Sequence, residues 1–581
     1  MYLAQLNITN FRKLQNVELY FQPGLNIVVG ANNVGKTAVV DALRALLAGH
    51  DEPYPRLSVE DIHHPKGGTP AGDITFQYVF RGLDADDEAD FLAALKPDGA
   101  GLLEAHIWAR YGDADKGGRL RVKRWCGDHE DVGLTSDMME NLRGVYLQPL
   151  RDASQGLKPS RTSQLARLLQ LLADESGRDG INAALKKLDD ELKTHPPIVN
   201  TQQAISTRHD AMLGGQLAQA LEIGLSASDF QRLSSRLSLL VDTFEIEQNG
   251  LGFNNLIFMA VVLSELAKNP EATYRGLIIE EPEAHLHPQL QAILLRYLES
   301  IQAAAGDKPV QLFVTSHSPN FASIADLDCL ACMVETGSGI ETFFPRTIVF
   351  EKGKREKLER YLDVTRAELF FARRVIFVEG AAELMLVNSL AAKAGFNLRE
   401  HGVSLISVEG LNFDSFLPLF GENALKIPVA LITDADPVDE PADGSEPQAL
   451  YPKADDTIKV SDNTAKMKKL EDKFIKVCHG VKTLEYDLAL HADNRTAMLI
   501  ALKELHPRIA VGVQADVDAA TGDAEKARAL FRGMFERTQN NVQKGKFGQA
   551  LAQVFKDGAA CVVPKYICDA VEHACQTAEP K

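Results

Sequence analysis

The sequence predicts an α/β protein whose second half contains a parallel sheet. Short apolar runs of strand length occur in both halves, and several of them end in glycines or carboxylates. Helical patterns alternate with these runs, which is typical of parallel sheets joined by crossover helices. A long helical stretch, at 156–240, interrupts the first half. At 581 residues the chain is too long for one core, so we expect about two to four domains.

Charge and cysteine content say more about the environment of the protein than about its function. The formal net charge is −18, which is unusual for a nucleic-acid binder, but net charge hides local patches and excludes little. The seven cysteines lack metal-like spacing, and their odd number argues against a disulfide framework. We find neither a signal-peptide pattern nor an apolar run of about 18 residues. We therefore expect a cytoplasmic protein with no membrane partner.

The clearest motif is a phosphate-binding loop near the start of the chain. Residues 30–37, Gly-Ala-Asn-Asn-Val-Gly-Lys-Thr, match the GxxxxGK[ST] pattern in full, with an apolar strand before them and a helical pattern after them. In such loops the glycines let backbone amides surround phosphate oxygens, the lysine attracts the β- and γ-phosphates, and the threonine hydroxyl binds Mg²⁺. The candidate ATP-binding residues are Gly30, Asn32, Asn33, Gly35, Lys36 and Thr37. A chance glycine-rich loop is the weaker alternative.

Two later strand ends supply the acids and the histidine that a nucleoside triphosphatase needs. The run GLIIEEPE places Glu280 where an acid would face the metal and Glu281 where a base would activate water. The apolar run 310–315 ends in Ser-His-Ser-Pro, so His317 lies at a strand tip, where it is predicted to sense the γ-phosphate. A purely structural histidine is the alternative.

The second half of the chain gathers carboxylates at strand ends. The run RVIFV ends in Glu379, and the run VALIT ends in Asp434 and Asp436. These acids should converge, because the carboxyl ends of parallel strands meet at one edge of a sheet. Clustered anions repel one another and lose hydration, so a sheet gathers them chiefly to hold cations, and oxygen ligands select Mg²⁺ or Mn²⁺. Glu383, one helical turn after Glu379, would lie on the same face of a following helix. Taken singly, each acid is more typical of an exposed loop.

The first half resembles the ABC-type ATPases of the RecF/SMC group. The resemblance covers roughly residues 1–350 and is carried by ITNFRKLQNVEL, GANNVGKT, LIIEEPEAHLHP and FVTSHSP. It implies that Gln148 contacts Mg²⁺ and water, and that residues 248–252, with Gly250 at their centre, take the place of the signature loop. That loop would contact nucleotide held by a second subunit, so the resemblance implies a homodimer with ATP between the two copies.

The sequence departs from this pattern in two places. Glu280 replaces the usual aspartate, and the serine-glycine-glycine signature is only loosely met. Hydrolysis is therefore expected to be slow, or to need a partner protein such as a helicase-like one.

The stretch between Gln148 and residue 248 has helical periodicity. Its leucines recur at helical spacing, at Leu165, Leu168, Leu169, Leu172, Leu185, Leu188, Leu192, Leu217, Leu221 and Leu225. The pattern predicts an inserted helical hairpin. A dimer contact and a subdomain packed on its own ATPase core are equally good interpretations.

The second half resembles the Toprim domain of type-II topoisomerases, bacterial primases and certain nucleases, through VEG at Glu379 and the aspartate pair in ITDADP. With the ATPase motifs and the segment TLEYDL, essentially the whole chain resembles the overcoming-lysogenization-defect (OLD) family of nucleases. The resemblance implies two divalent ions, one activating water and one stabilising the leaving oxygen. One ion would be held by Glu379, Asp434 and Asp436, and the other by Glu383, Glu485 and Asp487.

A lysine near the C-terminus assists at the scissile phosphate in that family, in a KGxFA-like motif. The segment KGKFG at 544–548 matches it except for the final glycine. Lys544 is the preferred candidate and Lys546 the second. The alternative is that both lysines are ordinary solvated surface charges.

These inferences combine into a domain plan and a function. The plan has an ATPase at 1–155 and 241–365, the helical insertion at 156–240, and a Toprim nuclease domain at 366–581. The expected function is that of an ATP-binding, divalent-metal-dependent DNA endonuclease, in phage defence or DNA repair. The rival is a non-cleaving, ATP-gated DNA-binding scaffold of the RecF/SMC kind, against which the second acidic set argues because a docking module does not need it. A topoisomerase would require a DNA-attacking tyrosine domain, which the sequence does not indicate.

Overall fold

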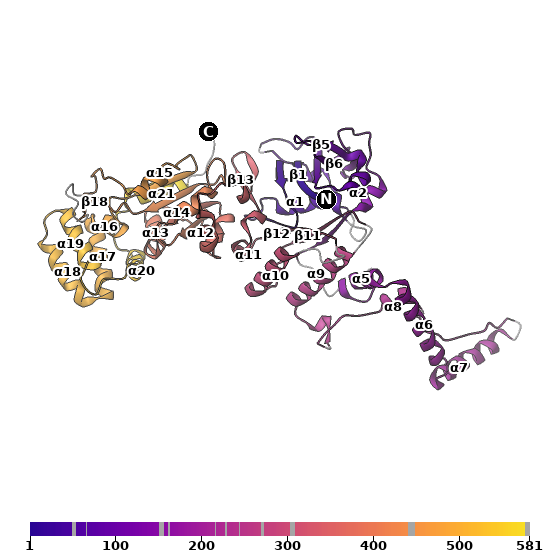
Figure 1. Cartoon of the computed structure of the whole chain (residues 1–581). Coiled ribbons are helices and arrows are strands. Elements are labelled where there is room, and N and C mark those ends of the chain that lie inside the picture. Colours follow the sequence, from indigo (N-terminus) through magenta and orange to yellow (C-terminus); the bar gives the residue numbers. More distant parts are fainter. Residues whose placement is uncertain are drawn as a thin grey trace.

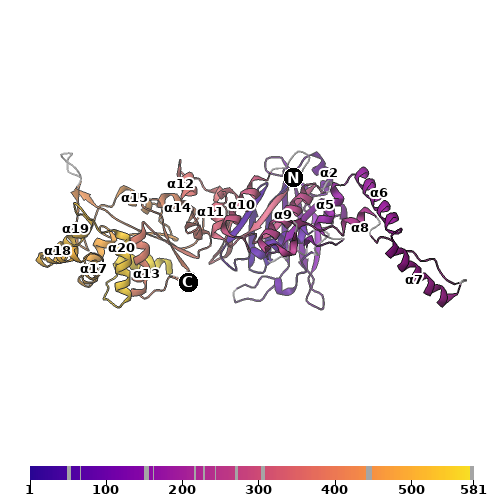
Figure 2. The ribbon, with the colours of Figure 1, turned by 90° about the horizontal axis from the view of Figure 1, so that it is seen from below.

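The computed structural model describes residues 1–48, 54–65, 67–149, 156–160, 163–214, 217–226, 229–242, 244–268, 272–301, 308–439 and 448–575. The molecule is elongated (Figure 1). A head, formed by residues 1–149 and 244–350, lies between a helical arm, residues 163–234, and a C-terminal domain, residues 351–575. Seen from below, the arm again extends away from the other two parts (Figure 2).

The head is built around a largely parallel sheet with the strand order β14-β13-β3-β12-β11-β8. Its strands are β3 (Leu25–Gly30), β8 (Leu142–Leu147), β11 (Tyr274–Glu280), β12 (Gln311–Thr315), β13 (Leu330–Thr336) and β14 (Gly339–Phe343). All residues of β3, β11 and β12 are buried, which explains their nearly continuous apolar sequences. Ile27 and Val29 share a core cluster with helices α9 (Leu251–Lys268) and α10 (Pro288–Ser300), whereas Val28 belongs to the cluster around α1 (Lys36–Leu47).

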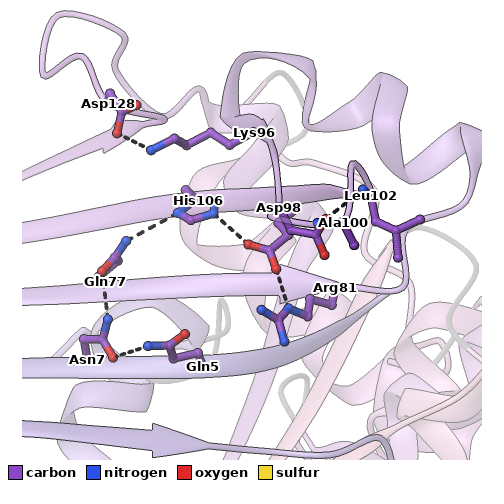
Figure 3. A network of polar contacts seen from close by, with 11 residues as sticks. Gln5, Asn7, Gln77, Arg81, Lys96, Asp98, Ala100, Leu102, His106 and Asp128 are labelled. Atoms are coloured by element: carbon purple, nitrogen blue, oxygen red, sulfur yellow. Dashed lines mark hydrogen bonds and ion pairs between the residues drawn. The ribbon is translucent and has the colours of Figure 1, made fainter.

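An antiparallel sheet packs over α1 and completes the head. Its strands are β1 (Tyr2–Phe11), β2 (Leu14–Tyr20), β4 (Ile74–Arg81), β5 (Leu95–Pro97), β6 (Leu103–Gly112) and β7 (Arg121–Cys126). Leu6, Ile8 and their neighbours pack inward, and the alternate residues form polar contacts on the outer face. Figure 3 shows these contacts running from Gln5 through Asn7 and Gln77 to His106. This alternation of buried and polar residues is typical of strands that have one face in the core and one face toward solvent.

The arm differs from the predicted helical hairpin. It contains α5 (Gln164–Leu172), α6 (Glu175–Leu192), α7 (Pro196–Leu213) and α8 (Phe230–Ser234). Helices α6 and α7 meet at an angle and diverge instead of packing side by side (Figure 1). The helical prediction around Leu221 and Leu225 was wrong, because 217–226 is not helical. This segment instead runs back along the arm, where the backbone N–H of Ile223 donates to Gln202 and that of Leu225 to Asp189.

The C-terminal domain is a parallel sheet in the order β16-β15-β17-β20, surrounded by helices. Its strands are β15 (Arg374–Val378), β16 (Val403–Ser407), β17 (Val429–Thr433) and β20 (Ile475–His479). Its longer helices are α12 (Lys354–Tyr361), α13 (Ala381–Lys393), α17 (Ala492–Leu505), α18 (Pro507–Ala519), α19 (Asp523–Phe535), α20 (Lys544–Lys556) and α21 (Lys565–Cys575). Phe377 belongs to a hydrophobic cluster that continues into the head, so the two parts share a core.

Short elements complete the chain. They are α2 (Ala85–Asp90), α3 (Ser136–Asn141), α11 (Pro319–Ile324), α14 (Phe413–Phe416), α15 (Asp462–Lys468), α16 (Leu484–Ala489) and the strand pairs β9 (Leu240–Val241) with β10 (Phe244–Glu245) and β18 (Val438–Asp439) with β19 (Gln448–Ala449).

Helix α9 is long and apolar enough to cross a membrane by length and composition alone. It contributes Met259, Val262, Leu263 and Leu266 to the core of the head and packs against α5. These contacts identify it as a core helix.

Candidate functional site

The phosphate loop turns between β3 and α1, and two of its glycines are required by their surroundings. Gly30 has φ +151°, and a Cβ there would lie 2.4 Å from the carbonyl oxygen of Met333. Gly35 has φ +98°, and a Cβ there would lie 2.7 Å from Cδ2 of Leu14. Any larger residue would therefore strain the backbone and collide with β13 or β2. Asn32 and Asn33 are exposed at the tip of the loop.

The side chain of Lys36 is buried beneath this loop. Its Nζ donates to the carbonyl oxygens of Gly30 at 2.6 Å and Ala31 at 2.9 Å. Burial lowers the pKa of Lys36 to about 8, although the carboxylates of Glu281 and Glu283 oppose the shift. The ammonium group is thus held by the loop's own carbonyls in a place where phosphate oxygens would relieve the cost of its burial. A nucleotide phosphate therefore fits this site.

A cavity of about 200 Å³ opens beside the loop. It is lined by Arg12, Lys13, Asn33, Gly35, Lys36, Thr37, Ala38 and His317. Arg12 and Lys13 belong to the ITNFRKLQNVEL motif but were not predicted as site residues. The structure places them on the wall of the phosphate cavity. The cavity is thus predominantly cationic, as anion binding requires.

The acid predicted to face the metal lies opposite Thr37. The Thr37 hydroxyl donates to Glu280 Oε1 at 2.9 Å, and the Tyr146 hydroxyl donates to Glu280 Oε2 at 2.6 Å. Burial, followed by the bond to Glu280, raises the pKa of Tyr146, so the phenol keeps the proton that it donates. The pair Thr37 and Glu280 offers a hydroxyl and a carboxylate side by side, which is the oxygen-only donor set that Mg²⁺ prefers.

Glu281 and His317 also meet, at the tips of β11 and β12. Nε2 of His317 lies 3.1 Å from Oε1 of Glu281. Burial and the charge of Lys36 lower the pKa of His317, so the ring is neutral near pH 7 and lies against the carboxylate of Glu281. Glu281 has φ +47°, which is uncommon for a residue other than glycine and is typical of functional turns.

Glu283, the third acid of the EEPE segment, lies in the site although the sequence did not predict a role for it there. Its Oε1 accepts from the Ser316 hydroxyl at 2.7 Å and from the backbone N–H of His317 at 2.9 Å. Its other oxygen, Oε2, is buried with no hydrogen-bond partner among the described residues. Burial raises the pKa of Glu283. Glu283 thus ties the loop after β11 to the loop that carries His317. Its place in the acidic EEPE segment was the only signal available in the sequence.

Two further predicted nucleotide contacts come from neighbouring segments. Gln148 follows β8, and the register that pairs Leu147 with Ile279 brings it next to Glu280. Gly250 precedes α9, in the loop predicted to replace the signature. Its predicted contact requires a second copy of the chain, so it stays a prediction.

Four acids of the C-terminal domain meet at the carboxyl edge of its sheet. Glu379 follows β15, and its Oε1 accepts from the Thr433 hydroxyl at 2.5 Å and from the backbone N–H of Asp434 at 2.8 Å. Asp434 follows β17, and its Oδ1 accepts from the backbone N–H of Leu484, at the start of α16. Glu383 on α13 and Glu485 on α16 are buried beside them.

The pKa values show how closely these acids crowd one another. Burial, Glu379 and Glu485 raise the pKa of Asp434 well above its usual range. Burial and Glu485 raise the pKa of Glu383. Lys544, at the first turn of α20, places its Nζ 2.9 Å from Glu485 Oε2. Although burial opposes its charge, Glu485 and Asp434 hold the pKa of Lys544 above its usual value. One ammonium group thus compensates several carboxylates.

The donor set fits divalent cations. Glu485 is completely buried, and neither of its oxygens accepts a well-aligned hydrogen bond within the described residues. The ammonium group of Lys544 is its charge partner but is shared with the neighbouring acids, so bound metal cations would lower the cost of burying Glu485 further. As the side chains stand, no three acidic, histidine or cysteine groups in the described part of the chain are close enough to surround one ion. Ion binding would therefore require side-chain rotation, and the two predicted ligand sets stay predictions.

Three predicted residues lie apart from this cluster. Asp436 is exposed, with φ +36°. Asp487 faces the turn before α16, where its Oδ1 accepts from the backbone N–H groups of Val481 and Lys482. Burial raises the pKa of Asp487 to about 7. Lys546 is exposed and forms no ion pair within the described ranges, whereas Lys544 reaches Glu485. The structure thus brings only one of the two candidate lysines to the acids.

The turn held by Asp487 gives a stability prediction. A Cβ on Gly480 would lie 1.5 Å from Asp487 Oδ2 and 2.8 Å from the ring of Tyr566. We expect Gly480→Ala to lower the free energy of unfolding by about 1–3 kcal/mol, the usual cost of overpacking a well-filled core. Denaturant unfolding measures the change. Gly512→Ala on α18 is the control, because a Cβ there meets nothing within 4 Å, and a loss as large as that of Gly480→Ala would contradict the explanation.

Comparison with known proteins agrees with the two halves of the fold. Residues 1–116 and 135–322 match the family model of the AAA ATPase domain. Residues 370–436 match the model of the overcoming lysogenization defect protein-like TOPRIM domain. An OLD nuclease of Thermus scotoductus is 27% identical over 482 residues, which cover 76% of this chain and 84% of that protein.

Two more relatives have a lower sequence identity to this chain. Endonuclease GajA of Bacillus cereus is 20% identical over 431 residues, covering 72% of this chain and 72% of that protein. The solved C-terminal region of the Burkholderia pseudomallei OLD protein is 25% identical, covers 35% of this chain and 98% of that chain, and superposes with a TM-score of 0.25.

The fold and the two sites define a protein in which an ABC-type ATPase head precedes a Toprim domain. The chain belongs to the AAA ATPase domain family, whose model matches more than half of its residues, and it carries a TOPRIM domain like that of the overcoming lysogenization defect protein.

Proposed function

We propose that the protein is an ATP-binding, divalent-metal-dependent DNA endonuclease whose Toprim domain cuts phosphodiester bonds and whose ATPase head regulates the cutting. The observation that carries this proposal is the group of acids around Asp434, in which Glu383 and Glu485 are buried and one ammonium group, that of Lys544, lies beside them. A docking module gains nothing from such a group, because burying uncompensated carboxylates destabilises the fold. The names of the OLD nuclease and endonuclease relatives support the same activity.

The residues of the Toprim edge have different tasks in this proposal. Divalent ions, when bound, supply an activated water and stabilise the leaving oxygen. Glu379 is held in place by the Thr433 hydroxyl and the backbone of Asp434, so its free oxygen, Oε2, can face one ion. The carboxylates of Glu379, Glu485 and Glu383 all act on Asp434, which would help to hold an ion at this edge of the sheet.

In this arrangement Lys544 would bind the DNA. Its side chain is 43% exposed while its Nζ reaches the buried Glu485. Once cations bind the carboxylates, the ammonium group is free to turn outward to a phosphate oxygen, which binds lysine as a point charge. Lys544 is therefore the lysine that we assign to the scissile phosphate, in preference to Lys546.

The head would bind ATP with Mg²⁺ through Lys36, Thr37 and Glu280, with Gln148 next to them. Glu281 is placed to accept a proton from water, and its contact with His317 links that base to the cavity that would hold the γ-phosphate. The contact between His317 and Glu281 would give the head a means to respond to the γ-phosphate. Nucleotide state would in this way regulate access of DNA to the Toprim edge.

The arm supports the proposal of a homodimer. Helix α7 has no buried residue within one chain, and it exposes Val199, Ile205 and Met212, with 79% of Met212 accessible. Exposed apolar side chains on a helix with no buried residue are typical of contacts between subunits. A cytoplasmic location and a role in phage defence or DNA repair complete the proposal. The expected helicase-like partner gains no support from the relatives.

A plasmid assay tests the proposed function. We expect supercoiled plasmid to be nicked or cut in the presence of Mg²⁺ or Mn²⁺ and to stay intact in EDTA, with a rate that changes when ATP is added. The variant Glu379→Ala, purified in the same way, controls for a contaminating nuclease. Intact plasmid under every ion and nucleotide condition, together with ATP-dependent DNA binding, would favour the non-cleaving scaffold instead.

A further inference from the structure

Glu280 stands where related ATPases were expected to carry an aspartate, and the difference has a physical consequence. Glutamate has one more methylene group and one more rotatable bond than aspartate, so its carboxylate can adopt more positions. A metal-facing acid must keep one oxygen directed at the ion, as it does here toward the Thr37 hydroxyl. Something else in the structure must therefore restrict the longer side chain.

Tyr146 is placed to supply this restriction. It lies on β8, which pairs in parallel with β11, the strand that ends in Glu280. Its hydroxyl donates to Glu280 Oε2 at 2.6 Å, while Oε1 faces Thr37 at 2.9 Å. The two carboxylate oxygens thus have separate partners. Tyr146 binds Oε2 and leaves Oε1 facing Thr37, where the metal would bind.

A residue of α1, Arg44, packs against the ring of Tyr146. The guanidinium carbon of Arg44 lies 4.2 Å from the centre of the Tyr146 ring, and Arg44 forms an ion pair with Asp41 at 3.1 Å. Asp41 in turn pairs at 2.7 Å with Arg12, on the wall of the phosphate cavity. Gly144 allows the close approach of β8 to α1, because a Cβ there would lie 1.8 Å from the carbonyl oxygen of Leu47.

We infer that Tyr146 is a positioning residue for the metal site of the head, fixing the carboxylate of Glu280 so that a glutamate can act in place of an aspartate. The inference rests on the proposed ATP-binding function. It extends that function by assigning a role to a residue that acts through Glu280. The chain of contacts from Arg12 through Asp41 and Arg44 to Tyr146 also ties the metal-facing acid to the phosphate cavity.

The test measures how much Mg²⁺ strengthens ATP binding, by calorimetric titration of the full-length protein with ATP at a series of Mg²⁺ concentrations and in EDTA. We expect Tyr146→Phe to raise the Mg²⁺ concentration for half-maximal strengthening about tenfold, since it removes one charge-assisted hydrogen bond from the metal-facing acid. ATP affinity in EDTA should stay within about twofold of the parent protein. A general loss of folding would lower both affinities.

Two further variants make the result specific. Tyr274→Phe removes another buried tyrosine hydroxyl of the head, one that donates to Gln311, and should leave the Mg²⁺ dependence unchanged. In a Glu280→Asp background the shorter acid no longer reaches Tyr146, so adding Tyr146→Phe should have no further effect.

Two outcomes would overturn the inference. One is an unchanged Mg²⁺ dependence in Tyr146→Phe, and the other is an equal effect of that substitution in both backgrounds. If the parent protein itself showed no Mg²⁺-dependent ATP binding, the proposed function of the head would fail instead.

Discussion

Replacing Glu485 with glutamine is expected to lower the rate of DNA nicking about a thousandfold while raising the thermal stability of the metal-free protein. The loss of activity follows because glutamine carries no charge to bind a cation, and the charge stabilisation that an ion supplies is worth several kcal/mol. Glu485 is the acid of the cluster that is completely buried with no well-aligned hydrogen bond among described residues. We therefore expect metal binding to lower the cost of burying the charge of Glu485 more than that of the other acids.

The gain in stability follows from the same burial. Glu485 is among the charges that raise the pKa values of Asp434 and Glu383, so removing it relieves repulsion inside the domain. The substitution also breaks the contact with Lys544, but that side chain is partly exposed and can return to water at little cost. We expect the midpoint of thermal unfolding in EDTA to rise by about 2–4 °C, the shift for roughly 1 kcal/mol in a domain of this size.

Two measurements on each protein check this prediction, the plasmid-nicking rate with Mn²⁺ and the unfolding midpoint in EDTA. Glu504→Gln, on the exposed side of α17, is the matched control and should change neither. A Glu485→Gln protein that nicks DNA at the parent rate would remove Glu485 from the catalytic group. One that unfolds at a lower temperature would show that its contact with Lys544 outweighs the repulsion.

The strands that carry both sites could be predicted because their sequences are dominated by burial on two faces. The runs that end in Gly30, Glu280 and Glu379 are continuous and apolar, and each stops where the chain reaches the carboxyl edge of a sheet. The polar residue that follows such a run must face solvent or a ligand. The convergence of Glu379 and Asp434 then follows from parallel pairing alone.

Other features depend on side-chain direction and on contacts between distant segments. Lys544 and Lys546 are two residues apart in one helix, so they point to different sides, and only the structure shows which side faces Glu485. Tyr146 reaches Glu280 across 134 residues of sequence. The segment around Leu221 has a helical period, but its backbone pairs with side chains of α6 and α7, which outweighs a local preference.

Replacing Lys36 with methionine is expected to weaken ATP binding about a hundredfold or more. Methionine keeps an unbranched side chain of similar length but has no charge, so the phosphates lose their charge-assisted hydrogen bonds. Calorimetric titration with ATP measures the change. The protein should remain at least as stable as the parent, because the substitution removes a buried charge whose pKa burial lowers to about 8. Lys503→Met, at an exposed position of α17, controls for the change in net charge.

The same lysine predicts how ATP affinity depends on pH. Bound phosphate requires the charged form, and with a pKa of about 8 the free protein holds that form at pH 7.5 but loses it as the pH rises. From pH 7.5 to pH 9.5 the charged fraction falls from roughly three quarters to about 3%, so affinity should fall about 25-fold.

Binding at pH 9.5 should also take up close to one proton per site. In calorimetry this uptake makes the binding enthalpy depend on the ionisation enthalpy of the buffer. The lowered pKa of Lys36 affects the stability of the fold in the opposite direction. The unfolded chain binds this proton up to the usual pKa of 10.5, so between pH 8 and 10.5 the stability of the free protein rises with pH. A pH-independent affinity without proton uptake would mean that the buried ammonium of Lys36 is not the group that receives the phosphates.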